Sequence, residues 1–140
     1  MKRILLIMLG LSAFSFAEFS RTSGVVTDSA TSLQWQDDYS DNAGNIKNAT
    51  WTAAIDYCEA LTLGGHTDWK LPNKKELLSI VDYATYSLAM SSVFQNTSSS
   101  NYWSSTTDAN DTSDAWLVHF YYGDTNGYDK TNTNYVRCVR

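Results

Sequence analysis

The sequence predicts a single α+β domain behind an export signal. Three observations predict this fold class. β-prone runs lie at both ends of the chain, two segments with helical spacing of apolar residues lie between them, and the first helical segment and the last β-prone run each contain one cysteine. Strands grouped at the two ends, rather than alternating with helices, are typical of an α+β domain.

Residues 1–17 have the features of a secretory signal peptide. A basic start precedes an apolar run from Ile4 to Phe16, and small residues occupy the two positions that a signal peptidase reads before a cut after Ala17. The run is shorter than the ~20 residues that span a bilayer, so a retained anchor is the less favoured alternative. We therefore expect residues 18–140 to form the mature domain, without stable membrane insertion, in a secreted, periplasmic or cell-surface location of a bacterium.

Removal of the signal leaves 8 basic and 15 acidic residues, a net charge of -7. An acidic domain without a basic stripe repels polyanions, which excludes nucleic acid as a partner. The remaining length of about 120 residues is that of one domain. Aromatic residues make up 14% of the sequence, and those not needed in the core are suited to a sugar-binding surface.

The first β-prone runs are Val25–Asp28 and Leu33–Gln36, which flank a polar segment of four residues. Two short strands around a polar turn predict an N-terminal hairpin. The next segment, Asp37–Asn48, is rich in Asp, Asn and Gly and has no periodicity, so we predict a loop.

The first helix is predicted between an N-cap at Asn48 or Thr50 and a stop at Gly64-Gly65. Residues at helical spacing give it one apolar face: Trp51, Ala54, Ile55, Cys58 and Leu61. Cys58 is therefore expected to point inward.

The second helix is predicted from Asn73 to about Tyr83. Pro72 fixes its entry, and Asn73 and Glu76 have the spacing of a capping box. Its buried face is expected to contain Leu77, Ile80 and Val81, after a turn anchored by Trp69 and Leu71.

The last part of the chain is predicted to be mostly strands. A loop over Ser91–Asn101 precedes a strand over Tyr102–Thr106, and an acidic turn over Asp108–Asp114 precedes a central strand over Ala115–Tyr121, which is apolar at both alternating positions. The final strand is Tyr135–Arg140.

Cys58 and Cys138 are the two cysteines, and disulfides persist in exported proteins. A bridge between them would close a loop of roughly 80 residues, for which chain entropy gives on the order of 4 kcal/mol. We expect them to pair. A free redox thiol or a metal ligand is the alternative, although no CxxC pattern is present.

Six groups of residues occur in one order along the mature chain: Val26-Thr27-Asp28 with Leu33-Gln34-Trp35-Gln36; Trp51 with Cys58; Asp68-Trp69-Lys70-Leu71-Pro72-Asn73-Lys74-Lys75-Glu76-Leu77; Tyr102-Trp103-Ser104-Ser105-Thr106; Ala115-Trp116; and Val136-Arg137-Cys138-Val139-Arg140. In order and spacing they resemble the Legionella collagen-like protein (Lcl) C-terminal domain family. The resemblance implies a C-type lectin-like fold, with two helices packed on a mostly antiparallel twisted sheet. It also implies a surface domain; the member that names the family carries it on a collagen-like stalk, trimerises and adheres to sulfated polysaccharides.

The chain departs from the family pattern in three ways. Ser32 stands where the family often has glycine, so we expect a left-handed backbone position there to be reshaped. Lys70 replaces an arginine and loses its bidentate donor geometry. No collagen-like repeat is present, and the acidic net charge argues against a sulfated ligand. A homotrimer is an expectation that the resemblance alone supports.

The candidate ligand-binding residues lie in the last third of the chain, where exposed rings could stack on a sugar and amides and carboxylates could hydrogen-bond to it. They are Trp116, Tyr121, Tyr122, Asp124, Asn126, Tyr128 and Asp129. We therefore expect a secreted, non-catalytic binding module for surface adhesion or glycan recognition, whose partner is an extracellular glycan or a surface protein. The alternative is a structural or assembly subunit of a surface or envelope complex that binds no ligand.

Asp124, Asn126 and Asp129 surround Gly127 in a pattern that would suit a calcium loop. The segment lacks the spacing and the closing glutamate of an EF-hand, and Asp-Asn-Gly clusters are first of all turn formers. A plain turn without a cofactor is the favoured prediction, and a Ca²⁺ site is the alternative.

The sequence predicts no catalytic activity. His66 and His119 have no third ligand at metal-site spacing, and no serine lies in a nucleophile elbow. The distant formylglycine-generating relatives of the family use reactive cysteines, whereas both cysteines here are expected to form a structural bridge.

Overall fold

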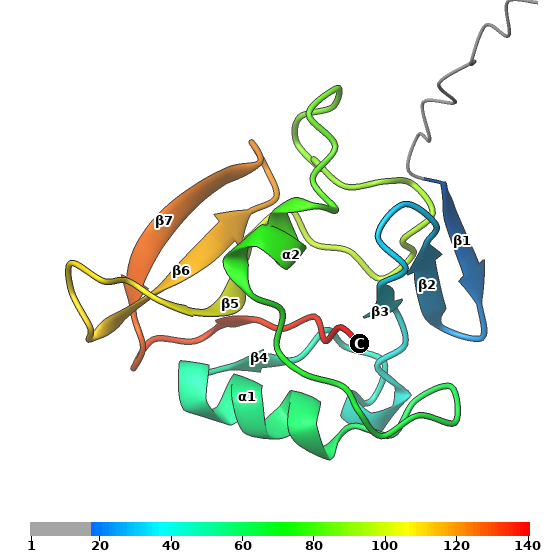
Figure 1. Ribbon diagram of the computed structural model, residues 1–140, viewed down its shortest axis with the longest axis horizontal. Helices are drawn as coiled ribbons and strands as arrows, with labels where there is room; N and C mark the ends of the chain where they lie inside the picture. Colours follow the sequence, from blue (N-terminus) through cyan, green and yellow to red (C-terminus); the bar gives the residue numbers. More distant parts are fainter. Residues whose placement is uncertain (1–17) are drawn as a thin grey trace, which may run out of the picture.

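A computed structural model describes residues 18–140, and the predicted signal peptide, residues 1–17, lies outside the described residues. In residues 18–140, eight β-strands form a three-stranded and a five-stranded sheet, and two α-helices and one short 3₁₀ helix accompany them (Figure 1). The α+β prediction is confirmed. None of the helices in the described part of the chain is long and apolar enough to cross a membrane.

The three-stranded sheet contains the predicted N-terminal hairpin. Its antiparallel strands are β1 (Phe19–Thr22), β2 (Val25–Asp28) and β3 (Gln34–Gln36), in that order. Strand β1 was not predicted from the sequence, because its four residues carry one apolar side chain, Phe19. Pairing with β2, rather than its own pattern, makes this segment a strand.

The turn between β2 and β3 keeps the left-handed residue that was expected to change. Ser32 has a φ of 60°, so the predicted reshaping is wrong. The Asp28 carboxylate accepts hydrogen bonds from the amide of Ala30 and the hydroxyl of Thr31, and the Ser32 amide donates to the Asp28 carbonyl at 2.8 Å. These bonds hold the turn in a conformation that serine reaches less easily than glycine.

The five-stranded sheet has the order β4-β8-β5-β6-β7, antiparallel except for the β5–β8 pair. The strands are β4 (Asn48–Ala49), β5 (Asn101–Thr107), β6 (Asp114–His119), β7 (Asp124–Asp129) and β8 (Asn134–Tyr135). The prediction of β6 as an interior strand is confirmed: Leu117 packs in one core cluster and Val118 in another, on opposite faces.

Two strand predictions need correction. The segment Asp124–Asp129, predicted to be a turn, is strand β7, because it pairs residue by residue with the apolar strand β6. The final strand is shorter than predicted: β8 ends at Tyr135, and beyond it Val139 makes single bridges to Trp35 and Lys70. The C-terminal segment therefore connects the two sheets.

Helix α1 (Trp51–Ala60) follows Thr50 as N-cap and ends at Leu61, before the two predicted stop glycines. The inward position of Cys58 is confirmed, since it is buried and bonded to Cys138 across 80 residues. The prediction of a disulfide between the first helix and the C-terminal segment is thus correct.

Helix α2 (Lys74–Leu78) is shorter than predicted. The capping box is confirmed: the Glu76 amide donates to Asn73 Oδ1 at 2.8 Å, and the Asn73 amide donates to Glu76 Oε1 at 2.9 Å. The helix ends because Ser79 Oγ donates to the Glu76 carbonyl at 2.6 Å and Val81 then bridges to Met90. The residues up to Tyr83 therefore leave the helix.

Two core clusters stabilise the domain. The first lies between α1 and the five-stranded sheet and includes the disulfide, Trp69, Trp103 and Leu117. The second lies on the other side of β6 and joins α2 to the three-stranded sheet through Val26, Trp35, Leu77, Tyr102 and Phe120.

Candidate functional site

The predicted ligand-binding residues lie on the β6–β7 hairpin, but on both of its faces. Trp116 lies opposite Gly127, and Asp129 is two residues further along β7. Because side chains alternate along a strand, Trp116 and Asp129 share one face, and the opposite face carries Asp124, Asn126 and Tyr128. These residues therefore do not form one site.

Trp116 was predicted to be exposed, and this is wrong. Its ring is half-buried beneath α2, where the Lys74 Nζ lies 3.5 Å from the ring centroid. This cation–π contact commits Trp116 to the packing of the helix on the sheet. On the other face, Tyr128 is 43% exposed and its ring centroid is 6.4 Å from that of Trp103.

The two tyrosines of the β6–β7 turn are exposed as predicted. Tyr121 is 36% and Tyr122 is 66% exposed, and their ring centroids are 4.4 Å apart in an edge-on arrangement. The His119 ring stacks on Tyr122 at 5.9 Å, and its Nδ1 accepts a hydrogen bond from the Tyr121 amide at 3.3 Å. The three rings therefore hold one another in place.

The loop between α2 and β5 passes close to this turn (Figure 1) and contains two further tyrosines. Tyr83 is 71% and Tyr86 is 80% exposed. The Ser87 amide donates to the Tyr121 carbonyl at 2.9 Å, and Gly123 lies so close that a Cβ there would be 3.3 Å from the Tyr83 ring. We call Tyr83, Tyr86, Tyr121 and Tyr122 the tyrosine patch.

Tyr83 and Tyr86 were missed because Tyr83 was assigned to the end of the second helix. The available signal was local. Two tyrosines stand three apart in Asp82–Ser87, a segment whose other residues are Asp, Ala, Thr and Ser. These neighbours offer little apolar surface to pack against the rings, so exposed rings are the expectation.

The calcium candidates do not converge. Asp124 and Asn126 share one face of β7, and Asp129 lies on the other. The Asp129 carboxylate accepts hydrogen bonds from the Thr131 hydroxyl at 2.6 Å and amide at 2.8 Å, and these lower the pKa of Asp129. Among residues 18–140, no group of three or more His, Cys, Asp or Glu side chains could hold a metal ion.

A separate acidic cluster lies at the other end of the hairpin. Desolvation, together with repulsion from Asp111, Asp129 and Asp108, raises the pKa of Asp114. The hydroxyl and amide of Ser113 hydrogen-bond to Asp111 and lower the pKa of that carboxyl. Asp114 is therefore the carboxylate of this cluster whose charged form is least stabilised by its surroundings.

The cysteines and histidines that could serve in catalysis make structural contacts instead. Both cysteines are in the disulfide, so neither supplies a thiol. The His66 carbonyl accepts a hydrogen bond from the Trp69 indole at 3.2 Å, and His119 belongs to the stacked rings of the hairpin turn.

The sequence model of the Lcl C-terminal domain family matches residues 24–140. The match begins after β1 and continues to the last residue. No curated protein matches the chain.

Proposed function

Since the chain belongs to the Lcl C-terminal domain family, we propose that the mature protein is a secreted, non-catalytic module that binds glycans at a surface. The tyrosine patch is the proposed contact. The observation that supports it is the gathering of four exposed tyrosines from two segments that are far apart in sequence and hydrogen-bonded to each other.

Tyrosine rings combine an apolar face, on which a pyranose can stack, with a hydroxyl that donates and accepts hydrogen bonds. Their two side-chain torsions make them inexpensive to immobilise on binding. In the patch, stacking among Tyr121, Tyr122 and His119 has already removed part of that freedom. The patch is therefore suited to an extended, weakly polar ligand.

The charges beside the patch favour a ligand without sulfate. Asp82 precedes Tyr83, and Asp124 follows the hairpin turn in the pairing position opposite His119. A sulfated chain would meet these carboxylates with repulsion and would find no neighbouring lysine or arginine in either segment. We propose neutral glycan chains as the ligand class.

The test is a glycan array probed with mature chain 18–140, with and without Ca²⁺. Tyr83→Ala with Tyr122→Ala should abolish retention and lower the melting temperature by no more than a few degrees, because both rings are largely exposed. Tyr128→Ala is the matched control, since Tyr128 is an exposed tyrosine of the same hairpin outside the patch. An equal loss of glycan retention in the control would place the binding site on the face of β7 that carries Tyr128 and would refute the patch.

The second candidate function is that of an assembly subunit, and the free edge of β7 is the observation that favours it. This strand ends the five-stranded sheet and pairs on one side, with β6. An open strand edge can pair with another chain. A mass in solution that rises with concentration, together with an array that stays blank for every variant, would support assembly over glycan binding.

A further inference from the structure

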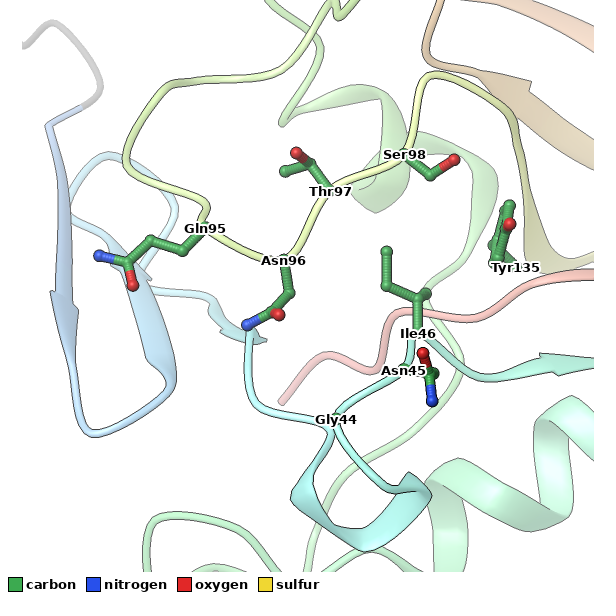
Figure 2. Close-up of a pocket in the computed structure, with 8 residues that line it drawn as sticks. All are labelled: Gly44, Asn45, Ile46, Gln95, Asn96, Thr97, Ser98 and Tyr135. Carbon is green, nitrogen blue, oxygen red and sulfur yellow. The ribbon is translucent and has the colours of Figure 1, made fainter.

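A polar pocket of about 410 Å³ opens away from the hairpin, between two loops (Figure 2). Residues 44–46 form one wall, residues 95–98 form the other, and the Tyr135 ring closes one end. Neither wall carries a charged side chain. The volume is within the range of small-molecule sites, roughly 300–1,000 Å³.

One wall is held in place by a buried carboxylate. Asp37 is fully buried, and its two oxygens accept hydrogen bonds from the amides of Gln95 at 2.9 Å and Asn96 at 3.0 Å. The Asp37 carbonyl accepts a further bond from Asn96 Nδ2 at 2.7 Å. The Ser98 amide donates to the Tyr102 hydroxyl at 3.0 Å. Three of the four residues of this wall therefore have fixed backbone partners.

A buried guanidinium completes this support. Arg137 is fully buried, donates to Asp37 Oδ1 at 3.1 Å and to the Gln36 carbonyl at 2.6 Å, and also donates to the Asn96 carbonyl. Its guanidinium carbon lies 4.7 Å from the Phe94 ring centroid.

Such an ion pair is a poor source of stability, because apolar residues of the same volume often stabilise a core as well or better. Here Asp37 and Arg137 satisfy the backbone of a loop that buries few apolar side chains of its own. Their contribution is a defined shape for the pocket wall.

The opposite wall is fixed by backbone contacts. The Gly44 amide donates to the Tyr39 carbonyl at 2.8 Å, and Asn42 Nδ2 donates to the Asn45 carbonyl at 2.8 Å. Gly44 itself has a φ of 78°, a conformation that favours glycine. Both walls are thus ordered before any ligand arrives, which removes an entropy cost of binding.

The groups left free in the pocket are uncharged. In the described part of the chain, the hydroxyls of Ser98 and Tyr135 have no hydrogen-bond partner among the protein's own groups, since Ser98 uses only its amide. Figure 2 shows the Ile46 side chain rising between Asn96 and Tyr135, while the Gln95 and Thr97 side chains point away from it. The pocket thus combines hydroxyls, which donate and accept, with one apolar side chain and one ring.

We propose that this pocket binds one uncharged sugar unit, without a metal ion, at a site separate from the tyrosine patch. Sugar hydroxyls match protein hydroxyls that both donate and accept, and the apolar side of the ring matches Ile46 and Tyr135. A carboxylated or sulfated sugar would be buried against these groups without an ion partner, which is unfavourable.

The test is an NMR titration of ¹⁵N-labelled mature chain with the methyl glycosides of glucose, galactose and N-acetylglucosamine, and with glucuronate as the charged comparison. A neutral glycoside should shift the amides of residues 44–46 and 97–98, and glucuronate should not. Ser98→Ala with Tyr135→Phe, which removes the two free hydroxyls, should weaken binding about tenfold, the loss expected for one or two hydrogen bonds. Ser92→Ala, at an exposed serine of the same loop outside the pocket, is the control and should leave the affinity unchanged.

Three outcomes would overturn this inference without touching the proposed function. The first is a titration in which Tyr122→Ala abolishes binding and the pocket variant does not, which would assign the sugar to the tyrosine patch. The second is equal binding of glucuronate. Absence of any shift in the pocket amides with all three neutral glycosides would also refute the pocket, whatever the array shows for the patch.

Discussion

Replacement of Asp37 by asparagine tests the centre of the polar network directly. The change keeps the shape of the side chain and removes its charge, so one oxygen becomes an amide group that donates. In the native protein, the buried Asp37 carboxylate accepts hydrogen bonds from four donors: Arg21 Nε at 2.6 Å, Arg137 Nη1 at 3.1 Å, and the amides of Gln95 and Asn96. The variant would place a donor against donors and leave the buried guanidinium of Arg137 without its counter-charge.

The magnitude follows from the burial of the pair. Breaking a fully buried ion pair by removing one partner costs about 3–5 kcal/mol. The contact with Arg21 adds little, because that side chain is 24% exposed and screened by water. A loss of this size is a large share of a stability of about 5–15 kcal/mol, and it corresponds to a fall in melting temperature of about 10–20 °C.

The assay is urea denaturation followed by tryptophan fluorescence at pH 7. Asp56→Asn is the matched control, since Asp56 is exposed on α1 and should change stability by less than about 0.5 kcal/mol. Hydrogen exchange provides a second measurement, in which the amides of Gln95 and Asn96 should lose protection ahead of the β5 amides. A destabilisation below about 1 kcal/mol, or unchanged exchange at these two amides, would refute the assigned role of Asp37.

Three further predictions concern other parts of the fold. Replacing Cys58 and Cys138 by serine should lower the free energy of unfolding by about 4.5 kcal/mol, the chain-entropy value for the observed separation of 80 residues; a loss below about 2 kcal/mol in urea denaturation would contradict it. Asn73→Ala should destabilise by about 1 kcal/mol through loss of the cap, and Lys70→Met by less, because its ion pair is half exposed; the reverse order would be inconsistent with the capping box. Asp114→Asn should raise the melting temperature at pH 7, because a raised folded-state pKa means that the charged carboxylate opposes folding. The gain should vanish below about pH 4, where the carboxyl is protonated in both states, and a gain independent of pH would refute the electrostatic cause.

The sequence was most informative where a local pattern has one structural solution. The β2–β3 hairpin, the α1 face and the capping box of Asn73 and Glu76 were predicted because their partners lie within a few residues. The disulfide was predicted because Cys58 had one cysteine to pair with.

The two strands that were not predicted, β1 and β7, have a common physical cause. β1 and β7 are polar outer strands, and each is a strand because a more apolar neighbour offers its backbone groups. A pattern read along one strand does not contain the register with the next. The predicted site was wrong for the same reason. Trp116 and Tyr128 are aromatic residues of the same hairpin, but their side chains lie on opposite faces of it.

The segment between α2 and β5 illustrates why the proposed binding surfaces were harder to predict than the core. Its second half, Ser91–Asn101, was predicted to be a loop because it has little to bury, and that prediction is correct for Ser91–Ser100. The segment's apolar side chains Ile80, Met90 and Phe94 are buried in the second core cluster, and the polar residues between them are held by hydrogen bonds. Its partners are Tyr121 near its start and Asp37 near its end, 58 residues from Gln95 in sequence.

The contacts that order this segment also keep some of its side chains at the surface. Hydrogen bonds to the β6–β7 turn keep Tyr83 and Tyr86 at the surface, and the buried Asp37 keeps the pocket wall in one conformation. Binding groups on such a loop can be replaced without loss of the fold, because the scaffold contacts use backbone atoms rather than the exposed side chains. Under the proposed function, ligand preference would change by substitution within the loop, whereas a change at Asp37 or Arg137 would impair both stability and binding.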